Sequence, residues 1–198
     1  MKYIGSTFPR PPKEVAMTSL VPKVLEPTEG LRLRSGPGRD LVFKVTGEDT
    51  GGAFDYFIVE VAPKGGPPLH VHHKQEETIH ILRGQFTIRI GEETFHCGEG
   101  GFAYLPSGVP HAFLNTTDEP GEIVVVYTPG GGHKFYEELG PLTRDGTPDR
   151  AAVAAVFENH NMTLLGPPIT DDSTPIRAHP GTLAQPSGGK ARLAGRLS

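Results

Sequence analysis

Two stretches of the sequence, Gly65–Gly84 (GGPPLHVHHKQEETIHILRG) and Gly98–Asn115 (GEGGFAYLPSGVPHAFLN), decide how the chain is interpreted. The first holds two histidines two residues apart and then a pair of glutamates, and the second holds a histidine after the turn sequence PSGVP. Short runs of β-branched and aromatic residues, bounded by glycine and proline, surround both stretches. This pattern is typical of short strands joined by tight turns, so it predicts an all-β domain.

The composition fits one soluble domain with additional segments at its ends. The chain has 198 residues, 36% of them hydrophobic, with 26 glycines and 20 prolines. A net charge of −4 without a basic patch argues against a nucleic-acid partner, and the single cysteine rules out an intrachain disulfide framework. The absence of a long apolar run or of a secretory signal leads us to expect no membrane association and a cytoplasmic location.

Turn signals recur along the first two thirds of the chain at the spacing of a β-sandwich or barrel. After three consecutive glycines at 130–132 the pattern changes, and Asp149–His160 reads as a helix with Thr147 as its N-cap and Pro148 at its first position. We therefore expect a proline-rich extension (1–30), a β-barrel (31–130), a helical segment packed on the barrel (131–166) and a disordered tail (167–198).

Three histidines are candidate metal ligands. His70 and His72 are two residues apart, which on a strand places both rings on the same face. His111 begins another strand, in which Phe113 and Asn115 share its face. Neutral imidazole is the most common metal ligand in proteins, and two imidazoles on one face form half of a site.

A glutamate completes the candidate site. Glu77 shares its strand face with Ile79 and Ile81, so it is expected to point into an apolar interior, where a metal or a proton relieves the cost of burying a carboxylate. Glu76 is the alternative ligand, although its strand parity is opposite. Three imidazoles and one carboxylate suit one divalent transition metal (Fe, Mn, Ni, Cu, Co or Zn). By parity, His73 and His80 are expected to point away from the ion.

The spacing of these residues resembles that of the two motifs of the cupin superfamily. The first motif, H-x-H, four residues, E, six residues, G, is matched by His70, His72, Glu77 and Gly84. The second, G-x5-P-x-G-x2-H-x3-N, is matched by Gly100, Pro106, Gly108, His111 and Asn115. The departures are a leading glycine five rather than six residues before the first histidine (Gly65) and Gly101 where aspartate is common. The resemblance implies a single jelly-roll β-barrel with a metal near one mouth and one or two short C-terminal helices.

The chain from Leu31 to Pro168 further resembles single-domain, quercetinase-like cupins, through the run GGGHKFYEELG (130–140) and the sequence LGPP (165–168). This resemblance implies a metal-dependent, ring-cleaving dioxygenase acting with dioxygen on a flavonol-like or enolisable aromatic molecule. Glu77 would be both ligand and general base. Five residues are expected to line the substrate pocket: Ile79, Ile81, Phe113, Asn115 and Tyr104.

Two other function classes remain open: a non-catalytic cupin that binds a small molecule, and another cupin enzyme such as an isomerase or decarboxylase. Enzymes that act on small acids usually place a cation beside the metal. Among inward strand positions we find only Arg83, which disfavours oxalate-type substrates. The resemblance also implies a homodimer, because cupin barrels often pair through their edge strands.

Overall fold

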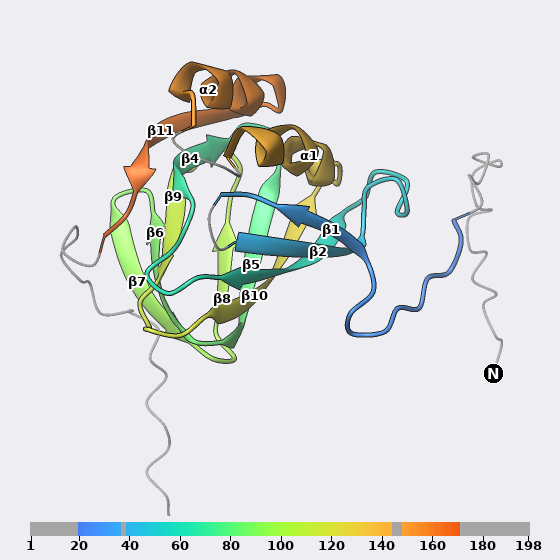
Figure 1. The fold of residues 1–198 in the computed structure, drawn as a ribbon, viewed down its shortest axis with the longest axis horizontal. Coiled ribbons are helices and arrows are strands. Elements are labelled where there is room, and N and C mark those ends of the chain that lie inside the picture. Colours follow the sequence, from blue (N-terminus) through green and yellow to red (C-terminus); the bar gives the residue numbers. More distant parts are fainter. Residues whose placement is uncertain (1–19, 37–38, 144–147, 171–198) are drawn as a thin grey trace, which may run out of the picture.

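The computed structural model of the protein describes residues 20–36, 39–143 and 148–170, and over these ranges it forms a β-barrel of two sheets with two helices at one end (Figure 1). The first sheet has the strand order β1-β2-β3-β10-β5-β8. Its strands are β1 (Leu31–Arg34), β2 (Arg39–Val45), β3 (Asp55–Val61), β10 (Gly121–Thr128), β5 (Glu76–Arg83) and β8 (Phe102–Leu105). The second sheet, β11-β4-β9-β6-β7, consists of β11 (Met162–Pro168), β4 (Pro68–His72), β9 (His111–Asn115), β6 (Gln85–Ile90) and β7 (Glu93–Gly98). The predicted jelly-roll architecture is confirmed.

Alternation along the strands separates the barrel interior from its surface. In β3, Phe57, Val59 and Val61 are buried, while Tyr56 and Glu60 on the opposite face are exposed. This period of two is what a strand with one face on a core requires. The interior-facing side chains of both sheets form one hydrophobic cluster, whose largest members include Phe43, Phe57, Phe86, Leu41, Ile79, Ile81, Ile88 and Leu105.

Antiparallel pairing brings the two informative stretches together. Strand β4 pairs with β9 so that His70 lies opposite His111. Strand β5, in the facing sheet, pairs with β10 and β8 so that Glu77 lies opposite Tyr127 and Leu105. The histidines therefore come from one wall of the barrel and the glutamate from the other.

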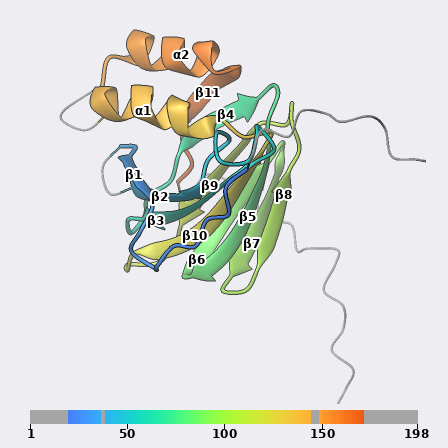
Figure 2. The ribbon, with the colours of Figure 1, turned by 90° about the vertical axis from the view of Figure 1, so that its right-hand side faces the viewer.

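The two helices lie together at the end of the barrel where β4 and β1 are found, as Figure 2 shows. Helix α1 (Gly132–Thr143) packs against α2 (Arg150–Asn159), and Phe135 contacts Phe157 edge to face at 4.9 Å. One face of α2 is apolar and packed against the rest of the protein, because Val153, Val156 and Phe157 are all buried. Neither helix in the described ranges combines the length and the hydropathy that crossing a bilayer requires.

The N-cap of α2 differs from the prediction. The cap is Asp149, whose side chain accepts hydrogen bonds from the backbone N–H groups of Ala151 and Ala152 at 2.8 and 3.4 Å. Asp is as good an N-cap as Thr, so sequence preference could not choose between Asp149 and Thr147. Thr147 itself lies outside the described residues.

The predicted boundary between the helical segment (131–166) and the tail (167–198) also differs from the structure. A strand, β11, follows α2 and pairs antiparallel with β4, placing Met162 opposite His72 and Leu164 opposite His70. After β11, Ile169 is buried in a cluster with Ala112 and Leu114 of β9. The expected tail therefore begins later than residue 167. The prolines at 167 and 168 hid this strand, because proline is depleted in strands and is confined to edges such as this one. Of the extension and tail, residues 1–19 and 171–198 lie outside the described ranges.

A buried carboxylate anchors α1 to the barrel. Asp55, at the start of β3, is fully buried, and its two oxygens accept hydrogen bonds from the N–H groups of Gly47, Gly131 and Gly132 at 2.6, 2.8 and 2.7 Å. The last two amides are those of the residue before α1 and of its first residue, so the carboxylate lies at the helix N-terminus, where a negative charge is favourable. Asp55 thus sets where α1 begins and how it meets the barrel.

Replacement of this carboxylate tests its role. Asp55→Ala leaves three N–H donors without their partner, and we expect the free energy of unfolding to fall by about 3 kcal/mol or more. Urea denaturation followed by circular dichroism measures the change. Asp40→Ala, which removes only an exposed ion pair with Arg34, is the matched control and should cost less than about 1 kcal/mol. A similar loss in both variants contradicts the anchoring role of Asp55.

Candidate metal centre

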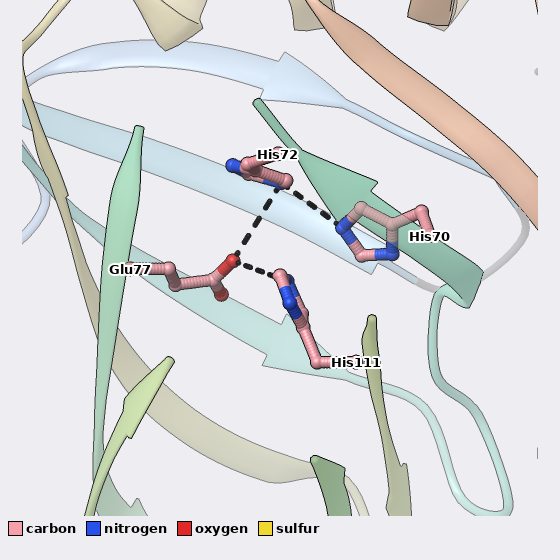
Figure 3. A group of neighbouring side chains, drawn as sticks. All are labelled: His70, His72, Glu77 and His111. Atoms are coloured by element: carbon pink, nitrogen blue, oxygen red, sulfur yellow. Dashed lines mark hydrogen bonds and ion pairs between the residues drawn. The ribbon is translucent and has the colours of Figure 1, made fainter. Parts of the chain in front are cut away.

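Four buried side chains converge inside the barrel: His70 and His72 from β4, His111 from β9 and Glu77 from β5 (Figure 3). Each offers one ligand atom, and all four atoms lie within 4.8 Å of one another. The cluster is the set of residues expected from the sequence. No other group of this kind occurs in the described part of the chain.

The separations within the cluster fit a bound ion. His70 Nε2 and His72 Nε2 are 3.1 Å apart, Glu77 Oε2 is 3.2 Å from His111 Nε2, and it is 3.8 Å from His72 Nε2. Metal–ligand bonds of about 2.0–2.2 Å place neighbouring ligand atoms roughly 3–4 Å apart. Without an ion, two imidazole nitrogens 3.1 Å apart share one proton in a single hydrogen bond. A metal ion would instead accept a lone pair from each nitrogen. Residues and geometry therefore fit a divalent transition metal.

Backbone carbonyls orient two of the three imidazoles. His70 Nδ1 donates to the carbonyl of Pro68 at 2.8 Å, and His111 Nδ1 donates to the carbonyl of Val109 at 2.9 Å. A proton held on Nδ1 leaves the Nε2 lone pair free to bind a metal. His72 Nδ1 is buried and has no hydrogen-bond partner among the described residues.

The turn before β9 places His111 opposite the first two histidines. Gly108, with φ of 80°, donates its N–H to the carbonyl of His72 at 2.7 Å, and the Ser107 hydroxyl donates to the same carbonyl at 3.3 Å. Glycine adopts this positive φ without strain. The turn is therefore fastened to the end of β4, next to the site.

Burial keeps the β4 histidines neutral. It lowers the pKa of His70 well below the usual value, with smaller contributions from His111 and His72. It lowers the pKa of His72 to about 4, although the charge of Glu77 opposes the shift. Burial alone would lower the pKa of His111, but the hydrogen bond and charge of Glu77 together with the Val109 carbonyl outweigh it and raise that pKa. Neutral imidazole is the form that binds metal, so His70 and His72 are ready to bind at ordinary pH.

Strand parity separated ligands from their neighbours correctly. Glu77 is buried and Glu76 is exposed. His73 is exposed, its Nε2 lies 2.8 Å from the Thr163 hydroxyl, and His80 is exposed on the outer face of β5. None of these three neighbours reaches the cluster.

A narrow cavity of about 30 Å³ lies beside the ligands and has room for roughly two water molecules. It is lined by His70 and Glu77 and, among others, by Phe113, Tyr127 and Phe57. Phe113 thus contacts the cavity as expected. Ile79 and Ile81 are fully buried in the barrel core and do not line it, so the expected isoleucine wall for a substrate ring is absent from this cavity.

Two further pocket assignments need correction. Asn115 is fully buried, but its side chain does not face the cavity. Its amide donates to the backbone carbonyls of Val61, Ala62 and Glu119, and its oxygen accepts from Thr117. These hydrogen bonds hold the loop after β9 in place. Tyr104 lies on the outer face of β8 with 47% of its surface exposed. In β8 the inward positions are the alternate residues, so Tyr104 cannot reach the interior.

One charged residue beside the ligands was missed. Arg39, at the start of β2, is half-buried and lines the cavity together with His70 and Glu77. Arg83, the cation proposed from the sequence, is exposed at the far end of β5. The sequence offers little sign of Arg39, because this residue follows the sequence Gly-Pro-Gly and precedes the apolar alternation of β2 by two residues.

Two tyrosines also line the cavity. Tyr127 of β10 and Tyr136 of α1 join their hydroxyls in a hydrogen bond of 2.8 Å, and the Tyr127 ring meets the His72 ring edge to face. Burial raises the pKa of Tyr127 well above its usual value and raises the pKa of Tyr136 to about 12. Both hydroxyls therefore stay protonated near neutral pH, where they donate and accept hydrogen bonds.

A larger groove of about 690 Å³ lies outside this cavity, between the helices and the mouth of the barrel. Four residues line both spaces: Arg39, Pro68, Leu139 and Phe157. Phe157 also packs edge-on against the His70 ring at 5.8 Å. The shared lining shows that the groove adjoins the inner cavity at the helical end of the barrel.

The comparison with protein families agrees with this geometry. Residues 57–127 match the model of the cupin domain, a segment that runs from β3 to β10 and includes all four ligands. An uncharacterised protein of Streptomyces coelicolor is 32% identical over 57 residues, which cover 29% of this chain and 53% of that protein. An uncharacterised protein of Methanocaldococcus jannaschii is 30% identical over 80 residues, which cover 40% of this chain and 64% of that protein. The matches thus span less than two thirds of either relative.

Solved structures with similarity to the chain include two enzymes. A polyketide cyclase of Streptomyces resistomycificus has 23% identity and a TM-score of 0.48, with 55% of this chain and 80% of that chain covered. A sugar phosphate isomerase of Silicibacter pomeroyi, described as from a cupin superfamily, has 26% identity and a TM-score of 0.41, with 46% of this chain and 59% of that chain covered.

The assignment of the ligands predicts the metal content of variants. The full chain should carry close to one divalent transition metal ion per protomer, as measured by plasma mass spectrometry after dialysis. His111→Ala removes one of four donors and should weaken binding by at least about tenfold. His80→Ala changes a histidine on the outer face and should retain the metal. Equal retention by both variants, or a wild-type chain that neither holds nor takes up metal, contradicts the site.

Proposed function

We propose that the chain, whose residues 57–127 match the model of the cupin domain, is a metal-dependent enzyme acting on an enolisable small molecule, with dioxygenation as its reaction. The observation that supports this most directly is the position of Glu77. Its carboxylate is buried, lies among three imidazoles and lines the cavity that a reacting group would enter. A ligand that also faces the substrate space is placed to take a proton from the substrate.

The proposed chemistry divides between the ion and the chain. A metal held by His70, His72, Glu77 and His111 would act as a Lewis acid toward the substrate oxygen. Glu77 would accept the hydroxyl or enol proton, since its Oε2 is near the shared ligand centre. Two oxygen atoms from one dioxygen molecule would then enter the product.

The residues around the ligands would exclude water and orient the substrate. Phe113 and Phe157 form apolar walls at the cavity, and the protonated pair of Tyr127 and Tyr136 offers hydrogen-bonding groups to an entering oxygen. A dry, preorganised site strengthens electrostatic interactions with developing charge.

The size of the cavity limits which part of a substrate reaches the ligands. About 30 Å³ does not admit a flavonol ring system, whereas the adjoining groove of about 690 Å³ holds a molecule of drug size. We therefore propose that only the enolisable head group enters the cavity and that the rest of the substrate lies in the groove. This favours open-chain or side-chain enols over the fused flavonol core.

A second candidate is an isomerase or decarboxylase of a small acid. Arg39 beside the ligands favours it, because a guanidinium is the usual partner of a substrate carboxylate. The reason for setting this class aside, that Arg83 was the only inward cation, is wrong.

A non-catalytic binding role differs from both enzymes in giving ligand-induced thermal stabilisation without turnover. The homodimer stays a prediction that sedimentation would check.

Oxygen uptake by the metal-loaded chain tests the proposal. We expect consumption of one dioxygen per substrate with at least one member of a panel of flavonols, β-diketones and aromatic 2-oxo acids, measured with an oxygen electrode and product mass spectrometry. Substrate loss without oxygen uptake supports the isomerase or decarboxylase class. No substrate loss for any compound contradicts an enzymatic role on enolisable molecules.

Glutamine at position 77 tests the general base. Glu77→Gln keeps a side-chain oxygen but removes the proton acceptor, so turnover should fall by about 100-fold or more. Metal content, measured on the same samples, distinguishes a lost base from a lost ion. Glu76→Gln alters the exposed neighbour and should keep full turnover. Activity of the Glu77→Gln protein close to that of the wild type contradicts the assignment.

A further inference from the structure

We propose that Arg39 binds a carboxylate of the substrate and that the apolar body of the same molecule lies in the groove between the barrel mouth and the helices. The substrate class is thus an amphipathic organic acid. This inference rests on the proposed function in one respect, that the cavity beside Glu77 is where the substrate reacts.

The first argument is the position of Arg39. It lines both the inner cavity, with His70 and Glu77, and the outer groove, with Leu139 and Phe157. A group bound to its guanidinium therefore lies at the junction of the two spaces. A substrate anchored there can direct its reactive carbon inward and its remaining atoms outward.

The second argument is that Arg39 is held in place but not neutralised. Its Nε donates to the carbonyl of Ser35 at 3.1 Å, and its Nη2 donates to the Ser35 hydroxyl at 2.6 Å. Among the described residues no carboxylate pairs with it, whereas Arg34 on the neighbouring strand pairs with Asp40 at 2.6 Å. Its Nη1 makes no hydrogen bond within the described ranges. A half-buried guanidinium with free donors is suited to a planar, bidentate acceptor.

The third argument is the chemistry of the groove. Its walls are mainly apolar, formed by residues such as Val61, Leu139, Val153, Phe157 and Leu164. Its volume of about 690 Å³ is in the range of roughly 300–1,000 Å³ found for small-molecule sites. An apolar groove that ends at one cation matches a molecule with an apolar body and a single acidic group.

The groove favours a carboxylate over a phosphate. Arg150 is the other cation that lines it and is exposed on α2, whereas phosphate sites usually combine several donors with a free helix N-terminus. The N-terminus of α2 is already capped by the carboxylate of Asp149, which would repel an anion. One half-buried guanidinium with no second cation beside it is the arrangement expected for a carboxylate.

The experiment measures binding to the zinc-loaded full chain, without turnover. The probes are 2-naphthoate and its neutral analogue 2-naphthamide, titrated by calorimetry, with inorganic phosphate as a third ligand. The wild type should bind naphthoate at least about tenfold more tightly than naphthamide, because the carboxylate gains charge-assisted hydrogen bonds. Arg39→Gln should reduce this preference to about twofold or less, and Arg39→Lys should give an intermediate value.

Controls separate Arg39 from the metal and from the groove rim. Arg150→Gln removes the other positive charge of the groove and should leave the preference unchanged. Zinc content and circular dichroism of each variant confirm that the ligand cluster and the fold are intact. Loss of zinc from the wild type would refute the metal site, and through it the proposed function, while carboxylate preference could still be measured on the zinc-free chain.

Three results overturn the inference. The first is an unchanged preference in Arg39→Gln, which would place the carboxylate on the zinc. The second is loss of the preference in Arg150→Gln alone. The third is that the wild type binds phosphate in place of 2-naphthoate, or binds neither 2-naphthoate nor phosphate.

Discussion

The antiparallel pairing of β4 with β9, which sets His70 opposite His111, is the contact on which the site depends. It joins two stretches of chain that are about forty residues apart and brings three imidazoles onto one wall of the barrel. The turn before β9 reinforces it, because Gly108 and Ser107 both donate to the carbonyl of His72. Glu77 then completes the cluster from the facing sheet. The geometry of the site therefore depends on the packing of the two sheets as well as on the pairing of β4 with β9.

The elements at the helical end surround the ligand cluster with a cavity and an adjoining groove. Asp55 fastens the start of α1, and α1 in turn places Tyr136 against Tyr127. Phe157 of α2 meets the ring of His70, and β11 then returns to pair with β4. Residues of the two helices thus line both the narrow cavity and the wide groove beside it.

Much of this was predictable because it depends on local geometry. The period of two along a strand separates Glu77 from Glu76 and turns His73 and His80 outward, whatever the rest of the fold does. The spacing of the two motifs was enough to indicate the cupin resemblance and the four candidate ligands that the structure brings together. Parity alone could not say how deep a residue lies along the barrel, which is why Ile79 and Ile81 face the interior but line the core and not the cavity. Asn115 likewise faces inward but fastens a loop.

The sequence by itself determined the strand-rich fold, the four candidate ligands that cluster in the barrel and the neighbours that point away from them, because each follows from short-range spacing. Only the tertiary structure brought Arg39 beside His70 and Glu77, corrected the choice of Arg83 and Tyr104, and revealed β11 at the edge of the second sheet. The physical reason is that these contacts join segments distant in the chain. Arg39 lies about thirty residues from the nearest ligand and Phe157 more than forty from the last. Nothing in local periodicity records which distant segments close over the mouth of a barrel.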